Sequence, residues 1–343
     1  MSLLEVTDLQ TRFRTDDGIV KAVSGVSFTL DRGQTLGVVG ESGSGKSVTF
    51  LTVMGLLDPR HAEMSGSVRF DGKELLGARG SQLQKVRGSR IGMIFQDPMT
   101  SLNPVKRIGW QLEEAVLLHN DVTRHEARRR SVEILQEVEI PRADSRIDDY
   151  PHQFSGGMRQ RVMIAMALIN KPEVLIADEP TTALDVTTQA QILRLMKQLQ
   201  DEYEMAIVMI THDLGVVAEL SDDVIVMYGG RVVEQAKVEA LFAKPEMPYT
   251  WGLLGSLPRL NADSARLEQI PGQPPSLLHP PRGCAFNPRC AYAFDRCRQE
   301  LPELQPTSGA AEHLYRCHLT DEDRARIWET KKAAFGVAEG SAA

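Results

Sequence analysis

The stretch GESGSGKS, residues 40–47, decides the fold of this chain. It follows the short apolar run TLGVV (35–39) and precedes the run VTFLTVMGLL (48–57), which suits a helix. A strand, a loop of the pattern G-x-x-x-x-G-K-[ST] and a helix, in this order, are typical of a phosphate-binding loop. Its glycines let the backbone curl so that successive N–H groups point at phosphate oxygens. The stretch therefore predicts an α/β protein that binds the phosphates of a nucleotide.

The residues of this loop have different expected roles. The Lys46 ammonium brings a positive charge to the β and γ phosphates, and the Ser47 hydroxyl is the expected ligand of Mg²⁺. The backbone N–H groups surround the phosphates. The predicted nucleotide-binding residues of the loop are Gly40, Ser42, Gly43, Ser44, Gly45, Lys46 and Ser47.

Strand and helix patterns alternate along the first 240 residues. Apolar runs predict buried strands of a parallel sheet covered on both faces, at 35–40, 91–96, 173–178 and 206–211, and a strand with a turn is expected at 65–75. The run 223–235 predicts a hairpin that turns at Gly229 and Gly230. A helical pattern extends from Ile108 to about Ile140, where a proline follows.

A second motif, EVLIADEP (173–180), places two carboxylates at the end of a predicted strand. Asp178 closes the strand, a position from which a carboxylate can reach a phosphate-bound metal ion. Glu179 follows directly and is the expected general base that orients and deprotonates the attacking water. Such a pair alone is most often a polar strand end. Together with a complete phosphate loop, it indicates hydrolysis.

A third motif, FSGGMRQ (154–160), opens a predicted helix. Ser155 is a good N-cap, and Gly156 and Gly157 leave backbone N–H groups uncovered, so the start of this helix is a candidate anion site. One nucleotide does not need two such sites in one chain. We therefore expect the second site to bind a nucleotide held by a neighbouring subunit.

With these motifs, residues 1 to about 240 resemble the ATP-binding cassette family of transport ATPases. FSGGMRQ is similar to the family signature, with phenylalanine in place of the usual leucine and methionine in place of the usual glutamine. The resemblance implies an ATPase core with an antiparallel β subdomain and a helical subdomain at about residues 100–160. It also implies four further site residues. They are Gln96 as a Mg²⁺ contact that faces the membrane partner, Asp185 in a loop where two subunits sense each other, His212 as a γ-phosphate contact and Phe13 as a ring stacked on adenine.

The family also implies that two chains share each reaction site. ATP would bridge the phosphate loop of one chain and Ser155 and Gly157 of another, and so close the dimer. Hydrolysis to ADP and phosphate, with Glu179 orienting the water, Gln96 contacting the metal and His212 holding the γ-phosphate, would open it again. This motion would drive the membrane subunits.

Three stretches narrow the resemblance to the ATPase subunits of bacterial dipeptide and oligopeptide importers. They are DPMTSLNP (97–104), ADEPTTALDVTTQAQIL (177–193) and MPYTWGLLGSLP (247–258). The resemblance implies a second, paralogous ATPase subunit, two permease subunits and, indirectly, an extracytoplasmic solute-binding protein. It places the chain at the cytoplasmic face of the cell membrane as a peripheral protein. Nickel importers of the same branch share much of this pattern, so nickel or another small solute stays open as the cargo.

Composition bears on the alternatives. The longest apolar runs, such as 162–169, reach eight residues, whereas a membrane span needs about 18. The N-terminus lacks the apolar core of a secretory signal, so we expect a cytosolic protein.

A formal net charge of −7 argues against a nucleic-acid partner held by bulk electrostatics. It disfavours a cassette ATPase that acts on DNA or ribosomes. A nucleotide-regulated metal-cluster sensor is a third alternative, which rests on the cysteines alone.

All four cysteines lie near the end of the chain, after a change of composition at about residue 240. Proline-rich stretches predict an irregular C-terminal module at 241–343, beyond a nucleotide-binding domain at 1–240. The cysteines follow the spacing C-x5-C-x6-C-x19-C, at Cys284, Cys290, Cys297 and Cys317. The module offers few apolar residues for a core of its own, which favours a covalent or metal cross-link. Disulfides are disfavoured in the cytosol.

The interpretations that remain are an iron–sulfur cluster, a zinc site and free thiols that only pack. Structural zinc sites usually use close C-x2–4-C pairs, which this spacing lacks, whereas a cubane cluster takes one thiolate per iron and suits wider steps. The importer resemblance also implies a [4Fe–4S] cluster at these cysteines. We expect that cluster, in a structural or redox-sensing role far from ATP, with Zn²⁺ as the alternative.

Overall fold

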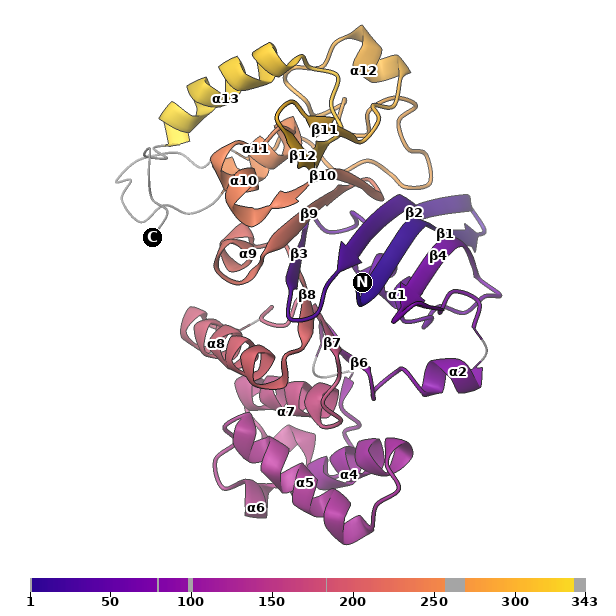
Figure 1. Ribbon diagram of the computed structural model, residues 1–343, viewed down its shortest axis with the longest axis vertical. Helices are drawn as coiled ribbons and strands as arrows, with labels where there is room; N and C mark the ends of the chain where they lie inside the picture. Colours follow the sequence, from indigo (N-terminus) through magenta and orange to yellow (C-terminus); the bar gives the residue numbers. More distant parts are fainter. Residues whose placement is uncertain (1, 79, 98–100, 183, 257–268, 336–343) are drawn as a thin grey trace. The chain divides into compact units, whose positions relative to one another are not determined.

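The structure is a computed structural model that describes residues 2–78, 80–97, 101–182, 184–256 and 269–335. Residues 98–100 and 257–258, which belong to two stretches singled out in the sequence, lie outside the described residues, as does Ala183. The chain divides into two compact units, whose elements are labelled in Figure 1. The helical unit comprises Met1–Glu5, Thr29–Thr35 and Arg69–Ile210, and the phosphate-loop unit comprises Val6–Phe28, Leu36–Val68 and Thr211–Ala343.

The phosphate-loop unit contains the strand that leads into the loop and the strands that continue its sheet. They are β3 (Thr35–Val39), β9 (Asp223–Tyr228), β10 (Arg231–Lys237), β12 (Ala310–Tyr315) and β11 (Gln305–Thr307). β3 pairs in parallel with β9, and the later neighbours pair antiparallel. The β9–β10 hairpin turns at Gly229 and Gly230, both at positive φ, which confirms the predicted hairpin.

A second sheet in this unit has the strand order β2-β1-β4. These strands are β1 (Leu4–Thr15), β2 (Gly18–Leu30) and β4 (Ala62–Phe70), and within the helical unit the end of β4 pairs antiparallel with β5 (Lys73–Glu74). The helices of the phosphate-loop unit are α1 (Lys46–Val53), α9 (Leu214–Leu220), α10 (Val238–Ala243), α11 (Pro248–Gly255), α12 (Asp295–Gln299) and α13 (Asp321–Phe335).

The C-terminal segment, residues 269–335, packs onto the phosphate-loop unit and shares its core. Tyr228, Tyr249, Phe286 and Tyr315 belong to one apolar cluster and are each at most 4% exposed. The first three rings lie 4.5 to 5.4 Å apart, in tilted and edge-to-face contacts. The segment is irregular before α12, as predicted, but it also adds β12 and β11 to the sheet and ends in α13 (Figure 1).

The helical unit contains three parallel strands in the order β6-β7-β8, with the predicted apolar runs buried in them. They are β6 (Ile91–Ile94), β7 (Val174–Asp178) and β8 (Ala206–Thr211). Its helices, with one 3₁₀ turn, are α2 (Gly80–Gln84), α4 (Ile108–His119), α5 (Arg124–Glu137), α6 (Ala143–Arg146), η1 (Pro151–Gln153), α7 (Gly156–Leu168) and α8 (Val186–Tyr203). The helical pattern predicted from Ile108 to about Ile140 forms two helices, because the Thr123 hydroxyl caps a new one by accepting the Glu126 N–H at 3.2 Å.

None of the described helices combines the length and the apolar character needed to cross a membrane.

A buried ion pair ties α13 to the rest of the phosphate-loop unit. Arg324 is 1% exposed, and its Nε donates to Glu246 Oε2 at 2.6 Å. Its guanidinium also lies 3.8 Å from the centre of the Tyr315 ring and donates to Asp321 and to the Leu319 carbonyl. Removing one partner of such a pair leaves the other charge buried.

Arg324→Met is therefore expected to lower the free energy of unfolding by about 3–5 kcal/mol, because Glu246 would lose its main partner. Arg326→Met is the matched control on the same helix. Its pair with Asp323 is 76% exposed on the arginine side, and its loss should cost less than about 1 kcal/mol. Urea unfolding of the two variants measures both values. Equal stabilities would contradict the assignment of Arg324 as a structural anchor.

Candidate functional site

The phosphate loop runs from Gly40 to the start of α1, and Lys46 folds back over it. The Lys46 ammonium donates to the Gly40 carbonyl at 2.6 Å and to the Glu41 carbonyl at 3.2 Å. The side chain of Lys46 is almost fully buried, whereas Ser42 and Gly43 are exposed at the turn of the loop. The loop thus holds a positive charge beneath an exposed backbone turn, as an anion-binding loop requires.

Two loop glycines are fixed by crowding. A Cβ at Gly40 would lie 2.2 Å from the Met227 carbonyl oxygen, and one at Gly45 would lie 2.5 Å from the Ala22 carbonyl oxygen. Both glycines also have positive φ, a region that other residues rarely adopt. Gly43 has positive φ too, but a Cβ there would meet nothing within 4 Å.

Four other loop or nearby positions complete the predicted set in this unit. Ser47 lies in the first turn of α1, and the buried Ser44 hydroxyl has no hydrogen-bond partner among the residues that the structure describes. An unpartnered hydroxyl inside the loop is consistent with a site for an oxygen-rich ligand. Phe13 is half-buried on β1, and His212 is exposed where β8 ends, just before Asp213 caps α9. The stacking role of Phe13 and the γ-phosphate role of His212 stay predictions.

In the helical unit, the structure brings Gln96 and Glu179 together. Gln96 follows β6, and its Nε2 donates to Glu179 Oε2 at 3.2 Å. The Thr182 hydroxyl donates to the same oxygen at 2.8 Å. Asp178 is the buried last residue of β7, and Glu179 has a φ of 48°, which is strained for a residue with a side chain. Two donors and a fixed backbone therefore hold the Glu179 carboxylate in one orientation.

The glycine-rich start of α7 lies beside the start of α8. Ser155 is the N-cap of α7, and its hydroxyl accepts the Met158 N–H at 3.3 Å, as the sequence predicted. Gly156 is open, whereas a Cβ at Gly157 would lie 2.9 Å from the Thr188 methyl group of α8. Asp185 caps α8, and the N–H of Thr188, followed by its hydroxyl, lowers the pKa of the Asp185 carboxyl. Exposed backbone N–H groups and a fixed carboxylate thus stand at adjoining helix starts.

Three residues near the phosphate loop were missed by the sequence reasoning. The Glu41 N–H donates to the Tyr249 hydroxyl at 2.8 Å, and the Glu41 carboxylate accepts two hydrogen bonds from Arg289. Glu41 occupies an unspecified position of the loop motif, and Arg289 lies 248 residues later. No pattern in the sequence connects them.

The cysteines lie in the phosphate-loop unit as free thiols. Cys284, Cys290 and Cys317 pack against the same apolar cluster, and the Cys284 N–H donates to the Cys297 carbonyl at 2.8 Å. Burial raises the pKa of the Cys290 thiol to about 11 and that of Cys317 to about 12, and the charges of the other thiols act in the same direction. In the described part of the chain, no three His, Cys, Asp or Glu side chains are arranged to hold a metal ion. The geometry therefore gives no support to the expected cluster or to zinc.

The expectation that a cluster at the cysteines lies far from ATP stays a prediction, but a neighbour of one cysteine contacts the phosphate loop. Arg289, the residue before Cys290, binds Glu41 of the loop itself. Both residues lie in one unit, and the C-terminal segment shares the apolar cluster of Val39, which directly precedes the loop.

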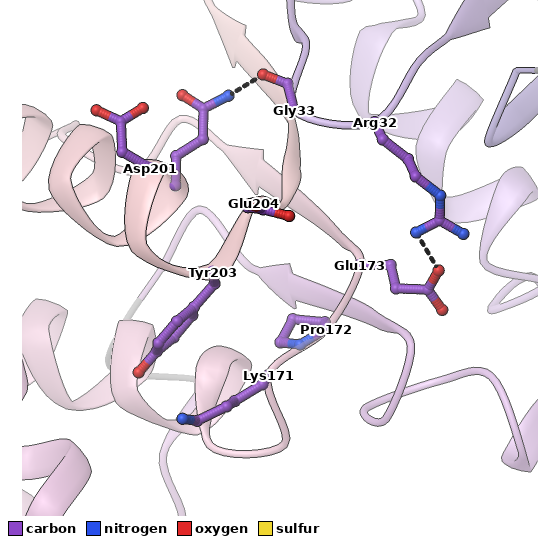
Figure 2. A pocket seen from close by; sticks show the side chains of 9 residues that line it. Arg32, Gly33, Lys171, Pro172, Glu173, Asp201, Tyr203 and Glu204 are labelled. Atoms are coloured by element: carbon purple, nitrogen blue, oxygen red, sulfur yellow. Dashed lines mark hydrogen bonds and ion pairs between the residues drawn. The ribbon is translucent and has the colours of Figure 1, made fainter.

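A separate cavity of about 510 Å³ lies in the helical unit (Figure 2). Several of its lining residues contact one another. Arg32 pairs with Glu173 at 2.6 Å, the Lys171 ammonium lies 5.0 Å from the centre of the Tyr203 ring, and Gln200 donates to the Gly33 carbonyl at 2.9 Å. No predicted site residue lines this cavity. It is therefore not a candidate for the nucleotide site.

Comparisons with known proteins agree with the motifs. Residues 23–182 match the family described as "ABC transporter", and residues 233–297 match "Oligopeptide/dipeptide transporter, C-terminal region". The chain is 52% identical over 320 residues to the oligopeptide transport ATP-binding protein OppD of Haemophilus influenzae, covering 93% of this chain and 98% of that protein. It is 53% identical to OppD of Salmonella typhimurium, over 88% of this chain and 89% of that one.

A solved structure is similar over about two thirds of the chain. It is the ATP-binding cassette MJ0796, a dimer in a post-hydrolysis state bound to ADP and Pi, with a TM-score of 0.62 and 28% identity. The match covers 68% of this chain and 98% of that structure.

The crowding around the loop glycines gives a test of its geometry. Gly43→Ala and Gly45→Ala both place a side chain at positive φ, at a cost of roughly 1–2 kcal/mol each. Only Gly45→Ala also collides with the Ala22 carbonyl, so it should displace the loop and abolish nucleotide binding, while Gly43→Ala weakens it modestly. Isothermal titration with Mg-ATP measures both affinities. Equal losses would mean that the crowding does not set the path of the loop.

Proposed function

Because the chain belongs to the ABC transporter family and is 52% identical to OppD over 93% of its length, we propose that it powers the import of di- and oligopeptides across the cytoplasmic membrane. It is an ABC-type ATPase subunit, and the permease partners would carry the peptide. The observation that carries the proposal is the presence, in one chain, of the ABC match at 23–182 and the oligopeptide/dipeptide C-terminal match at 233–297. We also propose the division into a nucleotide-binding domain at 1–240 and an extension at 241–343.

The proposed reaction is the hydrolysis of ATP by water to ADP and phosphate. Lys46 and the loop N–H groups would neutralise the phosphates, and Glu179 would orient the water and accept its proton. The strained backbone of Glu179 and its bonds from Gln96 and Thr182 support this role, because a base must be held in position to act. Phe13 would stack on adenine and His212 would contact the γ-phosphate.

A magnesium ion fits the oxygen donors that the motifs supply. Hydroxyl and carboxylate oxygens are the ligands that Mg²⁺ prefers, and the proposed ligands are Ser47, Asp178 and Gln96. When bound, the ion would neutralise charge that develops on the phosphate oxygens.

A dimer of ATPase subunits is the proposed working form. Ser155 caps the start of α7, the space around Gly156 is open, and Asp185 caps the start of α8, whose Thr188 adjoins Gly157. These groups would bind the nucleotide held by the other subunit.

We propose that the other subunit is a paralogous ATPase. The further proposed partners are two permeases and an extracytoplasmic solute-binding protein that acts indirectly. The chain would then be peripheral, at the cytoplasmic face of the membrane. Nickel or another small solute is the alternative cargo.

We propose, separately, that Cys284, Cys290, Cys297 and Cys317 bind a [4Fe–4S] cluster. The proposal rests on the spacing of the four cysteines, which lie in one unit as free thiols. A cluster needs one thiolate per iron, so its ligands stand farther apart than those of a single zinc ion. Zinc is the alternative. The cluster would donate no group to the ATPase reaction.

The function is tested in membranes that contain the chain with its co-purifying partners. We expect two polytopic proteins to co-purify, and peptide uptake to require ATP. Glu179→Gln should bind ATP normally while hydrolysis and uptake fall by orders of magnitude, because only the water-orienting carboxylate is lost. Lys46→Ala is the contrasting control, which should weaken ATP binding itself. Normal hydrolysis by Glu179→Gln, or nucleic acid in place of membrane partners, would refute the proposal.

The cluster is tested by preparing the protein without oxygen. We expect a brown protein with about four irons per chain, and loss of colour and iron in Cys317→Ser because one iron loses its thiolate. Elemental analysis and visible absorption measure both, with the unchanged protein prepared alongside. A colourless protein with one zinc, or with four thiols that react freely, would exclude the cluster.

A further inference from the structure

The C-terminal segment makes a direct contact with the phosphate loop through one ion pair. Arg289 Nη1 lies 2.5 Å from Glu41 Oε2, and Nη2 lies 3.0 Å from Oε1, so the guanidinium binds the carboxylate with two parallel hydrogen bonds. The arginine side chain is 4% exposed and the glutamate side chain 27%. A two-pronged pair with one partner fully buried fixes both direction and distance, unlike an exposed single contact.

Arg289 is itself held from every direction. Its Nε donates to the Pro271 carbonyl at 2.8 Å, Nη2 to the Ile270 carbonyl at 3.3 Å, and Nη1 to the Tyr228 hydroxyl at 3.2 Å. With the two bonds to Glu41, all five N–H donors of the guanidinium are in use. The Glu41 carboxylate, as the largest influence, raises the pKa of Arg289 further. The arginine therefore has a single position, and Glu41 is held against it.

Glu41 passes this restraint to the rest of the loop. Its N–H donates to the Tyr249 hydroxyl at 2.8 Å, and its carbonyl accepts the Ser44 N–H at 3.2 Å. The same carbonyl accepts from the Lys46 ammonium at 3.2 Å. One residue thus connects the first turn of the loop and its lysine to a buried tyrosine and a buried arginine. The two groups that hold Glu41 from outside the loop, the Tyr249 hydroxyl and the Arg289 guanidinium, are not among the predicted nucleotide-binding groups.

We propose that Arg289 is a positioning residue for nucleotide binding, which holds the phosphate loop in its binding conformation through Glu41. Binding of a nucleotide to a loop that is already ordered costs less conformational entropy than binding to a loop that must first be ordered. The C-terminal segment is then part of the nucleotide site, although it supplies no ligand to it. The inference rests on the proposed binding of ATP at Gly40–Ser47.

The test compares Arg289→Met with Arg324→Met, two substitutions of buried arginines in the same segment. Only Arg289 contacts the loop; Arg324 pairs with Glu246 instead. Arg289→Met is expected to weaken Mg-ATP binding about tenfold and to raise KM by the same factor, with kcat unchanged at saturation. Arg324→Met should lower stability without changing the affinity. Titration calorimetry and steady-state ATPase rates measure these values on the full chain.

Two further variants secure the result if Arg289→Met fails to fold. Glu41→Gln keeps the loop residue's size and its N–H bond to Tyr249, and Arg289→Lys keeps the positive charge but loses the two-pronged geometry. Each should weaken binding by less than Arg289→Met, and combining Glu41→Gln with Arg289→Lys should add little, because both remove the same contact.

Affinity equal to that of the unchanged protein in Glu41→Gln and Arg289→Lys would overturn the inference. Equal weakening in Arg324→Met would also overturn it, since the effect would then be general loss of stability. A different result would refute the proposed nucleotide site itself. In that case the unchanged chain would not bind ATP, or Lys46→Ala would bind it equally well.

Discussion

Two carbonyl oxygens leave no room for a side chain at Gly40 and Gly45, and the path of the phosphate loop depends on that crowding. The oxygens belong to Met227 on β9 and Ala22 on β2, so strands of both sheets in the phosphate-loop unit pack closely against the loop. Only glycine tolerates such close approach together with positive φ. The local motif is therefore sufficient to recognise the loop, but its shape is imposed by segments that lie far away in the sequence.

Local patterns predicted the strands β3 to β10 and the starts of α1, α4 and α7. The runs that became β3, β7 and β8 are buried at every position and contain only apolar residues and glycine apart from Thr35, Asp178 and Thr211 at the strand ends. The N-cap Ser155 marks the start of its helix by accepting a hydrogen bond from a residue three positions later. β12 gave no such signal, because only His313 and Tyr315 of its six residues are buried. The Glu41–Arg289 pair could not be predicted from the sequence either, because the strength of this ion pair depends on burial of the arginine in the folded chain.

Composition suggested that the C-terminal segment needs a cross-link, because it has few apolar residues. The structure supplies a different source of order. The side chain of Glu234 is fully buried and accepts hydrogen bonds from the Glu246 N–H and the Thr250 hydroxyl. Its Oε1 lies 2.8 Å from Nε2 of His313. With the Arg324–Glu246 pair, this polar network joins β10, β12 and α13. Fully satisfied networks of this kind specify one arrangement of a segment. This network orders the segment without a cross-link between the cysteines.

The separation of 248 residues between Glu41 and Arg289 has a consequence for biosynthesis. A ribosome adds about 5–20 residues per second, so it makes Arg289 roughly 12–50 s after Glu41. During that interval the phosphate loop exists without the arginine that restrains it. The edge of β10 that pairs with β12 has no partner strand yet. Under the proposed positioning role of Arg289, the nascent chain reaches its full affinity for nucleotide only after Arg289 has been made and has paired with Glu41.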